Sequence, residues 1–181
     1  MLFNLYNTLG AFTCLAINNL DKEKISKSIS KMNNNSKIFS SYKYGKRDVY
    51  VLNNKAENAS TYNQSVLFTS RDKGPKTLVL GWMEISRRYN FDDLSWLYDI
   101  NFELLNDKSV ERIILIGPFA YDIAARLKIA GIDPKKFLYC IDYTNSLDYS
   151  IKHTKGDLYC VVYFDLDYKY IDELKKRGVD L

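Results

Sequence analysis

The stretch of sequence that decides the fold is Arg112-Ile113-Ile114-Leu115-Ile116-Gly117. A nearly continuous run of branched apolar residues that ends in glycine is typical of a strand buried on both faces. A helical pattern follows over residues 120–130 and is closed by Gly131. The alternation of strand and helix then continues toward the C-terminus. It predicts an α/β fold with a mostly parallel sheet and helices on both faces.

Apolar spacing and turn signals extend this prediction to the rest of the chain. Helices are expected over residues 2–18, 22–31, 59–70, 120–130, 145–153 and 167–177. Strands are expected over residues 38–44, 48–52, 77–81, 112–117, 137–141 and 158–163, the first two as a hairpin around Gly45. The run Asn33-Asn34-Asn35 indicates a linker, so we divide the chain near residue 36 into a helical segment, 1–35, and an α/β domain, 36–181.

Composition narrows the class of protein without indicating its chemistry. The 181 residues are 46% hydrophobic and 27% charged, which is typical of a folded domain and not of a disordered chain. A formal charge of +4 gives no indication of nucleic acid or of a membrane surface. Residues 1–20 are apolar, but asparagines interrupt them and they lack a basic n-region, so we expect no transmembrane segment and a cytoplasmic protein.

The residues most often used by metal sites and catalytic triads are sparse. Cys14, Cys140 and Cys160 form no CxxC pair and are odd in number, so we expect free core thiols in a reducing compartment and no metal site. His153 is the single histidine, and it stands in a lysine-rich stretch that predicts a surface position. Asp165 and Asp167 are expected to cap the last helix. A triad made within this chain is therefore not expected.

Two places remain as candidate sites. The chain has no GxxxxGK[ST] phosphate loop, but Gly117 opens a helix directly after a strand, where backbone N–H groups can bind an anion. The second place is the polar loop 87–93 and the segment after it, which we expect to be extended. Its carboxylates can orient a histidine, hold a cation or accept hydrogen bonds from a substrate. Alternatively, Asp93 and Ser95 organise the turn while Trp96 fills the core, which composition alone favours.

Three segments carry a resemblance to a known family. Residues 93–103 read DLSWLYDINFE and resemble the D-x-S-W-[IL]-W-D-x-D-F-E motif of the MurT family, the Mur-ligase-like subunit of lipid II isoglutaminyl synthase. Residues 117–131, GPFAYDIAARLKIAG, resemble that family's G-x-R-A-x-D-x-A-x-R-L-K-Y-A-G segment. Residues 5–11, LYNTLGA, are similar to the Y-N-x-L-A-A helix that closes the family's central ATP-binding domain.

The resemblance implies a Rossmann-like sandwich of the Mur ligase C-terminal type over residues 36–181, preceded by a helical remnant of the central domain over 1–35. It implies a part in a carbon–nitrogen ligase that uses glutamine as amido donor. In that family the full-length protein binds ATP and activates the D-glutamate of lipid II, a peptidoglycan precursor, as an acyl phosphate. A glutaminase partner, GatD, then supplies ammonia.

The resemblance also implies which residues carry the function. The family's C-terminal domain holds the glutaminase and lends an aspartate to its Cys–His pair, and either Asp93 or Asp99 matches that aspartate. The further candidates for binding the substrate or the partner are Ser95, Trp96, Asn58, Asn63, Gly117, Asp122 and Arg126.

The sequence also departs from the family's pattern. The K-N-P-A-G-x-N segment reads ENASTYN over residues 57–63, and the P-loop, the central-domain catalytic residues and the cysteine-rich zinc ribbon have no counterpart. We therefore expect no cofactor in this chain, with ATP and Mg²⁺ only alongside the N-terminal and central domains, and no ligation by these 181 residues alone. The alternatives are a catalytically inactive stand-alone Mur-fold interaction module and a Rossmann-like binder of a small ligand at the Gly117 turn.

Overall fold

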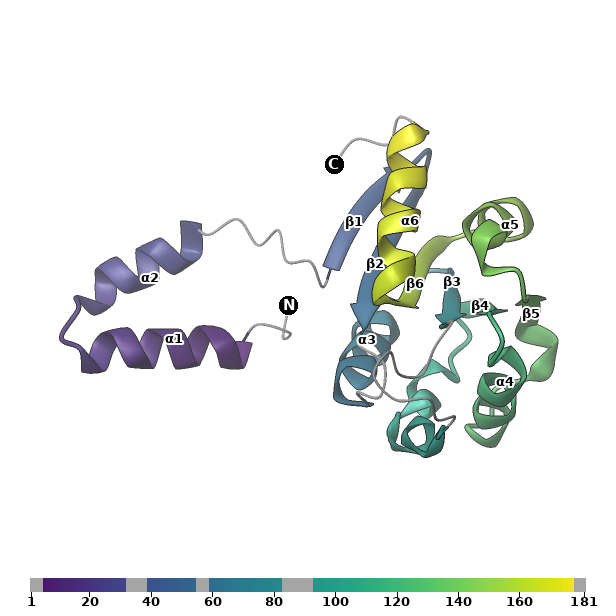
Figure 1. Cartoon of the computed structure of the whole chain (residues 1–181), viewed down its shortest axis with the longest axis horizontal. Helices are drawn as coiled ribbons and strands as arrows, with labels where there is room; N and C mark the ends of the chain where they lie inside the picture. The colour runs from purple at the N-terminus through teal and green to yellow at the C-terminus, as the bar shows by residue number, and fades with distance from the viewer. Residues whose placement is uncertain (1–4, 32–38, 55–58, 83–92, 178–181) are drawn as a thin grey trace. The chain divides into compact units, whose positions relative to one another are not determined.

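The computed structural model describes residues 5–31, 39–54, 59–82 and 93–177. It forms two compact units, Met1–Ser36 and Lys37–Leu181. In the first unit, α1 (Leu5–Ile17) and α2 (Lys22–Lys31) form a helical hairpin (Figure 1). The Asp21 carboxylate accepts hydrogen bonds from the backbone N–H groups of Glu23 and Lys24, at 2.8 and 3.0 Å, and so caps α2.

The second unit is an α/β domain whose helices and strands follow the predicted order. Its strands are β1 (Phe39–Tyr44), β2 (Arg47–Asn54), β3 (Lys76–Gly81), β4 (Val110–Ile116), β5 (Phe137–Cys140) and β6 (Asp157–Tyr163). Its α-helices are α3 (Ala59–Arg71), α4 (Ala120–Ile129), α5 (Ser146–His153) and α6 (Phe164–Lys176). Its short 3₁₀ helices are η2 (Ser95–Asp99), η3 (Phe102–Leu105), η4 (Pro134–Lys136) and η5 (Tyr143–Asn145).

The six strands make one sheet in the order β1-β2-β6-β3-β4-β5. All neighbours pair in parallel except β1 and β2, which form the predicted antiparallel hairpin. The central strands β3, β6 and β4 are buried, as their continuous apolar runs predict. Gly81 ends β3 where a Cβ atom would collide with the Ile116 carbonyl oxygen of β4, so this position needs glycine.

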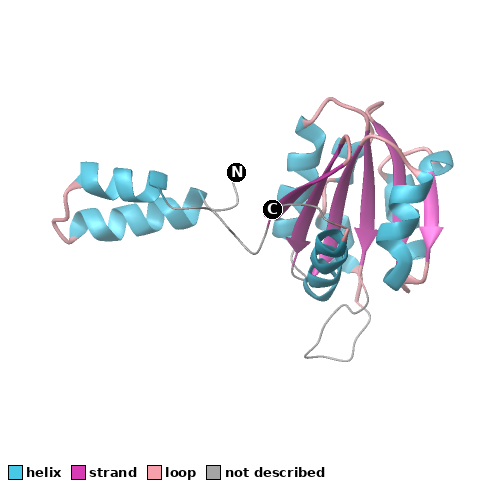
Figure 2. Cartoon of the chain, turned by 90° about the horizontal axis from the view of Figure 1, so that it is seen from above, coloured by secondary structure: helices cyan, strands magenta, loops and turns pink. Residues whose placement is uncertain are grey.

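Side chains alternate between the two faces of the sheet and build two separate cores. On one face, Leu78 and Leu80 of β3 pack with residues of α3, η2, η3 and α4. On the other face, Val79 packs with Leu147 of α5 and Leu174 of α6. Figure 2 shows helices on both sides of the sheet. The predicted α/β fold with a mostly parallel sheet and helices on both faces is confirmed.

Several finer expectations are wrong. The segment after Asp93 is not extended: it forms the 3₁₀ helices η2 and η3, because Trp96, Leu97, Phe102 and Leu105 must all reach the core from a short stretch of chain. The last helix begins at Phe164, so Asp165 and Asp167 lie within it and not ahead of it. Cys160 is a buried core thiol as expected, but Cys140 is only half-buried and Cys14 is exposed. In the part of the chain that the structure describes, no helix is long and apolar enough to cross a membrane.

Candidate functional site

The candidate site is the Asp93 segment, defined as residues 93–105, which belongs to the connection between β3 and β4. A cluster of aromatic rings attaches it to the carboxyl ends of these two strands. Trp96 of η2 lies with its ring centroid 5.0 Å from that of Trp82, which directly follows β3, and 5.3 Å from that of Tyr62 in α3. Phe119, just after β4, lies 6.5 Å from Trp82. The carboxyl edge of a parallel sheet is where α/β proteins usually place ligands.

Trp96 is only 9% exposed, so its ring packs in the core and is largely withdrawn from solvent. This agrees with the interpretation that Trp96 fills the core. It also places the neighbouring polar residues of η2 on the outside, since a 3₁₀ helix with one side buried leaves its other side in solvent. Ser95, Tyr98 and Asp99 are exposed, and Tyr98 is 60% exposed.

Asp93 begins the segment and organises its own turn. One of its carboxylate oxygens accepts a hydrogen bond from the backbone N–H of Ser95 at 2.8 Å. That bond and a second one from the Ser95 side chain hold the pKa of Asp93 below its usual value. The backbone N–H of Leu97 donates to the Leu94 carbonyl at 3.0 Å and closes the first 3₁₀ turn. Asp93 is therefore an exposed, ionised carboxylate that is already bonded to its own turn.

The backbone around Asp99 is held by the side-chain amide of Asn63 on α3. Asn63 Nδ2 donates to the carbonyl oxygen of Asp99 at 2.8 Å, and Asn63 Oδ1 accepts from the N–H of Asn101 at 2.7 Å. Between these groups Ile100 is extended, with φ −90° and ψ 128°, and its side chain is buried. The Asp99 side chain is exposed. Asn63 thus binds the backbone next to Asp99 and leaves the carboxylate open to solvent.

Arg126 of α4 binds the same segment from a second helix. Its guanidinium donates to the carbonyl oxygens of Leu97, at 3.3 Å, and Ile100, at 2.8 Å. It also forms an ion pair with Glu103, with Nη1 and Oε1 3.0 Å apart, and the hydrogen bond from Arg126 keeps the pKa of Glu103 low. Arg126 is only 5% exposed, and its guanidinium is bonded to groups of this chain.

The other predicted site residues are Gly117, Asp122 and Asn58, and the contacts described above do not include them. Gly117 has φ +77°, and its carbonyl accepts the N–H of Ala120 at 3.3 Å, so it forms the tight turn between β4 and α4. Asp122 is exposed in the first turn of α4. Asn58 lies outside the described residues. Of the predicted site residues, the structure brings together Asn63, Ser95, Trp96, Asp99 and Arg126, with Asp93 at the start of the same segment.

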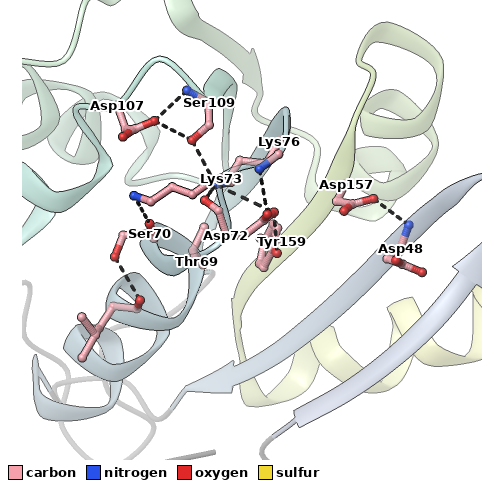
Figure 3. A network of polar contacts seen from close by, with 12 residues as sticks. Asp48, Thr69, Ser70, Asp72, Lys73, Lys76, Asp107, Ser109, Asp157 and Tyr159 are labelled. Carbon is pink, nitrogen blue, oxygen red and sulfur yellow. Dashed lines mark hydrogen bonds and ion pairs between the residues drawn. The ribbon is translucent and has the colours of Figure 1, made fainter.

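Sequence reasoning missed a second polar group, the amino-edge cluster, defined as Asp72, Lys76, Asp107, Ser109 and Tyr159 (Figure 3). It lies where β3 and β6 begin. Lys76 Nζ is completely buried, donates to Ser109 Oγ at 3.0 Å and to the Asp72 carbonyl, and lies 3.8 Å from the Asp72 carboxylate. Tyr159 donates its hydroxyl proton to Asp72 at 2.9 Å. In the sequence, the signal for this cluster is limited to Lys76, a lysine at the start of an apolar strand.

Burial is the main cause of the pKa shifts of Lys76 and Tyr159 in the amino-edge cluster. Burial lowers the pKa of Lys76, although Asp72 opposes that shift, and burial together with the bond to Asp72 raises the pKa of Tyr159. Ser109 donates from both its N–H and its hydroxyl to Asp107, at 2.8 and 2.6 Å. These groups bond to one another, which is the arrangement of a structural cluster.

No group of three or more His, Cys, Asp or Glu side chains in the described ranges is arranged to hold a metal ion. His153 is exposed at the end of α5, where it stacks on Tyr149 with ring centroids 4.2 Å apart, as its polar surroundings predict. Its Nδ1 atom lies 2.9 Å from the Tyr149 carbonyl oxygen. Both of these contacts are with α5.

Comparison with known proteins gives matches to one family and one fold. Residues 55–165 match the family model described as MurT ligase C-terminal. The chain is 28% identical over 131 residues to the MurT subunit of lipid II isoglutaminyl synthase (glutamine-hydrolyzing) from Staphylococcus aureus, in strains COL and N315 alike. Each match covers 72% of this chain and 29% of the relative, so the chain spans less than a third of these curated relatives.

Solved structures with the same fold are Mur ligases. UDP-N-acetylmuramate-alanine ligase MurC from Thermotoga maritima matches 96% of this chain and 38% of its own, with a TM-score of 0.63 and 10% identity. UDP-N-acetylmuramoylalanyl-D-glutamyl-2,6-diaminopimelate–D-alanyl-D-alanyl ligase from Acinetobacter baumannii matches 91% of this chain and 33% of its own, with a TM-score of 0.58 and 12% identity. At such low identities the likeness establishes the fold alone, and it agrees with the predicted Mur ligase C-terminal type.

Proposed function

This chain belongs to the MurT ligase C-terminal family, and on that premise we propose that it serves as the C-terminal domain of a MurT-type subunit. In this proposal it takes part in the ATP-dependent amidation of the D-glutamate of lipid II. It docks a GatD-type glutaminase and lends that partner an aspartate. The single observation that carries the proposal is the Asp93 segment, which holds two solvent-facing carboxylates on a folded backbone.

The chemistry of an aspartate lent to a partner accounts for this arrangement. A carboxylate that accepts the Nδ1 proton of a histidine holds the imidazole in the tautomer that can deprotonate a nucleophile. Such a carboxylate has to be ionised, exposed before docking and fixed in direction. Asp99 meets the last two of these needs, because its side chain is exposed while Asn63 binds its backbone. Asp93 is also exposed, but its oxygens already accept hydrogen bonds from Ser95.

The surroundings of Asp99 support docking of a protein. Tyr98 is 60% exposed beside it, and Leu104 of η3 is also exposed. Exposed aromatic residues such as tyrosine are enriched in protein interfaces. In this proposal ATP and Mg²⁺ bind to an ATP-binding domain outside these 181 residues, and residues 1–35 correspond to the last helices of that domain.

The experiment that tests the proposal is a glutaminase assay of the complex between this chain and the GatD-type glutaminase of the same organism. We expect the chain to raise glutamine hydrolysis by the glutaminase, and the Asp99→Asn variant to lower kcat by about 10²- to 10⁴-fold, the range typical of a lost acid–base contribution. Asp93→Asn is assayed beside it, and a comparable loss for that variant instead would assign the role to Asp93.

Asp133→Asn is the matched control. The Asp133 carboxylate accepts the N–H two residues ahead, that of Lys135 at 2.9 Å, as Asp93 does from Ser95, but it lies at the start of η4 and not in the Asp93 segment. We expect this variant to leave the activity of the complex unchanged. If the glutaminase binds the chain but neither Asp93→Asn nor Asp99→Asn changes its activity, the chain is an interaction module without a catalytic part.

A further inference from the structure

We propose that Asn63 and Arg126 are positioning residues, which together set the direction of the Asp99 carboxylate from two helices that flank the Asp93 segment. Resemblance to the family suggested both residues as contacts to a substrate or partner. The contacts in the structure instead turn their polar atoms toward the backbone of this chain. The inference rests on the proposed function in one respect, namely that Asp99 is the aspartate that acts on the partner.

The Asn63 contacts are specific to an asparagine. The carbonyl of Asp99 needs a donor at 2.8 Å, and the N–H of Asn101 needs an acceptor at 2.7 Å. A primary amide offers both on one small planar group, as a neighbouring strand would to an extended residue. Because Ile100 is extended between the two bonds, they fix the peptide groups on both sides of it. The direction of the Cα–Cβ bond of Asp99 is fixed with them.

Arg126 supplies the second constraint. Its guanidinium donates to the carbonyl oxygens of Leu97 and Ile100, which lie on either side of Asp99 in sequence. The same guanidinium forms an ion pair with the Glu103 carboxylate through Nη1. The guanidinium carbon also lies 5.8 Å from the ring centroid of Tyr98, directly before Asp99. A lysine in this place would keep the charge but could not reach two carbonyls and a carboxylate at once.

Together the two side chains bind four backbone groups within residues 97–101. Short 3₁₀ helices have poor internal hydrogen bonding, so these external bonds decide how firmly η2 is held. A site that must meet a histidine on another protein needs such prior order, because a misplaced carboxylate loses rate without losing affinity. This separates the positioning role from a role in docking.

The first test measures how firmly Asn63 holds the backbone at Asn101, in the full chain and without any partner. Amide hydrogen exchange is followed by NMR at Asn101 in wild type, Asn63→Leu and Asn63→Asp. Asn63→Leu removes both bonds and should speed exchange at Asn101 about tenfold, whereas Asn63→Asp keeps the acceptor and should retain most of the protection. Ser70→Ala, at the far end of α3, is the control and should change nothing. Unchanged exchange in Asn63→Leu would overturn the inference.

The second test measures the consequence in the complex with the GatD-type glutaminase. Asn63→Asp and Arg126→Lys should each lower kcat for glutamine hydrolysis about tenfold, with KM for glutamine and affinity for the glutaminase unchanged. Lys128→Ala, an exposed basic residue on the same helix as Arg126, is the control. A loss of affinity with an unchanged kcat would identify docking residues and overturn the positioning role.

A double-mutant cycle separates this inference from the proposed function. Asn63→Asp placed in the Asp99→Asn background should cause no further loss of kcat, because its effect passes through the carboxylate that is already gone. A full additional loss would overturn the inference while leaving the role of Asp99 intact. If Asp99→Asn itself had no effect, the proposed role of Asp99 would fail, and the positioning role with it. The exchange result would still decide whether Asn63 holds the backbone.

Discussion

The two edges of the sheet use charged side chains in opposite ways. At the amino edge, Lys76 and Tyr159 are buried and their polar atoms bond to Asp72 and Ser109 within the cluster. At the carboxyl edge, Asp93 and Asp99 face solvent. Asn63 binds the backbone beside Asp99, and the Asp93 carboxylate bonds only within its own exposed turn. An inward-bonded charge contributes to the stability of the chain, while an outward carboxylate on a held backbone remains available to another molecule.

This contrast predicts that substitutions at the two edges will have different effects on stability and on activity. Substitutions at the amino edge should lower the free energy of unfolding and should affect activity only through it. Substitutions of Asp93 and Asp99 at the carboxyl edge should change activity and leave stability nearly untouched. The following predictions test this difference from the largest expected effect to the smallest.

Lys76→Ala should have the largest effect on stability. It removes a fully buried ammonium and takes one of their partners from Asp72 and Ser109. Breaking a buried ion pair typically costs about 3–5 kcal/mol. Urea unfolding followed by circular dichroism measures it. Lys73→Ala, the exposed lysine three residues earlier, is the control and should cost less than about 0.5 kcal/mol. Equal effects of the two substitutions would refute a stabilising role for the cluster.

Tyr159→Phe should have a smaller effect at the same edge. The ring stays in the core, stacked on Tyr50 with centroids 4.7 Å apart, and only the hydrogen bond to the Asp72 carboxylate is lost. We expect a loss of about 1.5 kcal/mol, the usual value for a hydrogen bond to a charged group. Thermal unfolding compares it with wild type. A stability equal to that of wild type would mean that water replaces the hydroxyl at no cost.

Protonation of Glu103 at acid pH should lower the free energy of unfolding of the chain. Its pKa is lowered from 4.5 by Arg126, so this pair stabilises the folded chain above about pH 4.5 and its contribution is lost as the pH falls through the lower, folded-state pKa. The urea midpoint of wild type should fall more between pH 6 and acid pH than that of Glu103→Gln. Parallel curves for the two proteins would show that the ion pair contributes nothing.

Asp93→Asn and Asp99→Asn should have the smallest effect on stability. Both side chains are exposed, and an asparagine at position 93 can still accept the Ser95 N–H, so we expect free energies of unfolding close to that of wild type. The same variants carry the largest expected loss of glutaminase activity. A large destabilisation by Asp99→Asn would place this residue with the amino-edge cluster as a structural one.

Much of the fold could be predicted because its signals are local. The apolar run at 112–116 and the glycines at 117 and 131 bound β4 and α4 closely, since a buried strand and a helix each have their own spacing. The segment after Asp93 was misjudged because 3₁₀ helices as short as η2 and η3 have almost no period to detect. The burial of Trp96 and Phe102 against the sheet imposes them.

By itself, the sequence determined the α/β class, the order of the elements and the motif that contains Asp93 and Asp99, because these depend on spacing along the chain. Only the tertiary structure decided what Asn63 and Arg126 do: each meets partners that are 23–38 positions away in sequence. It likewise decided that Lys76 finds Ser109, 33 positions on, and can therefore be buried. A side chain's bonding partner depends on which elements the sheet and helices bring together, and no local pattern encodes that.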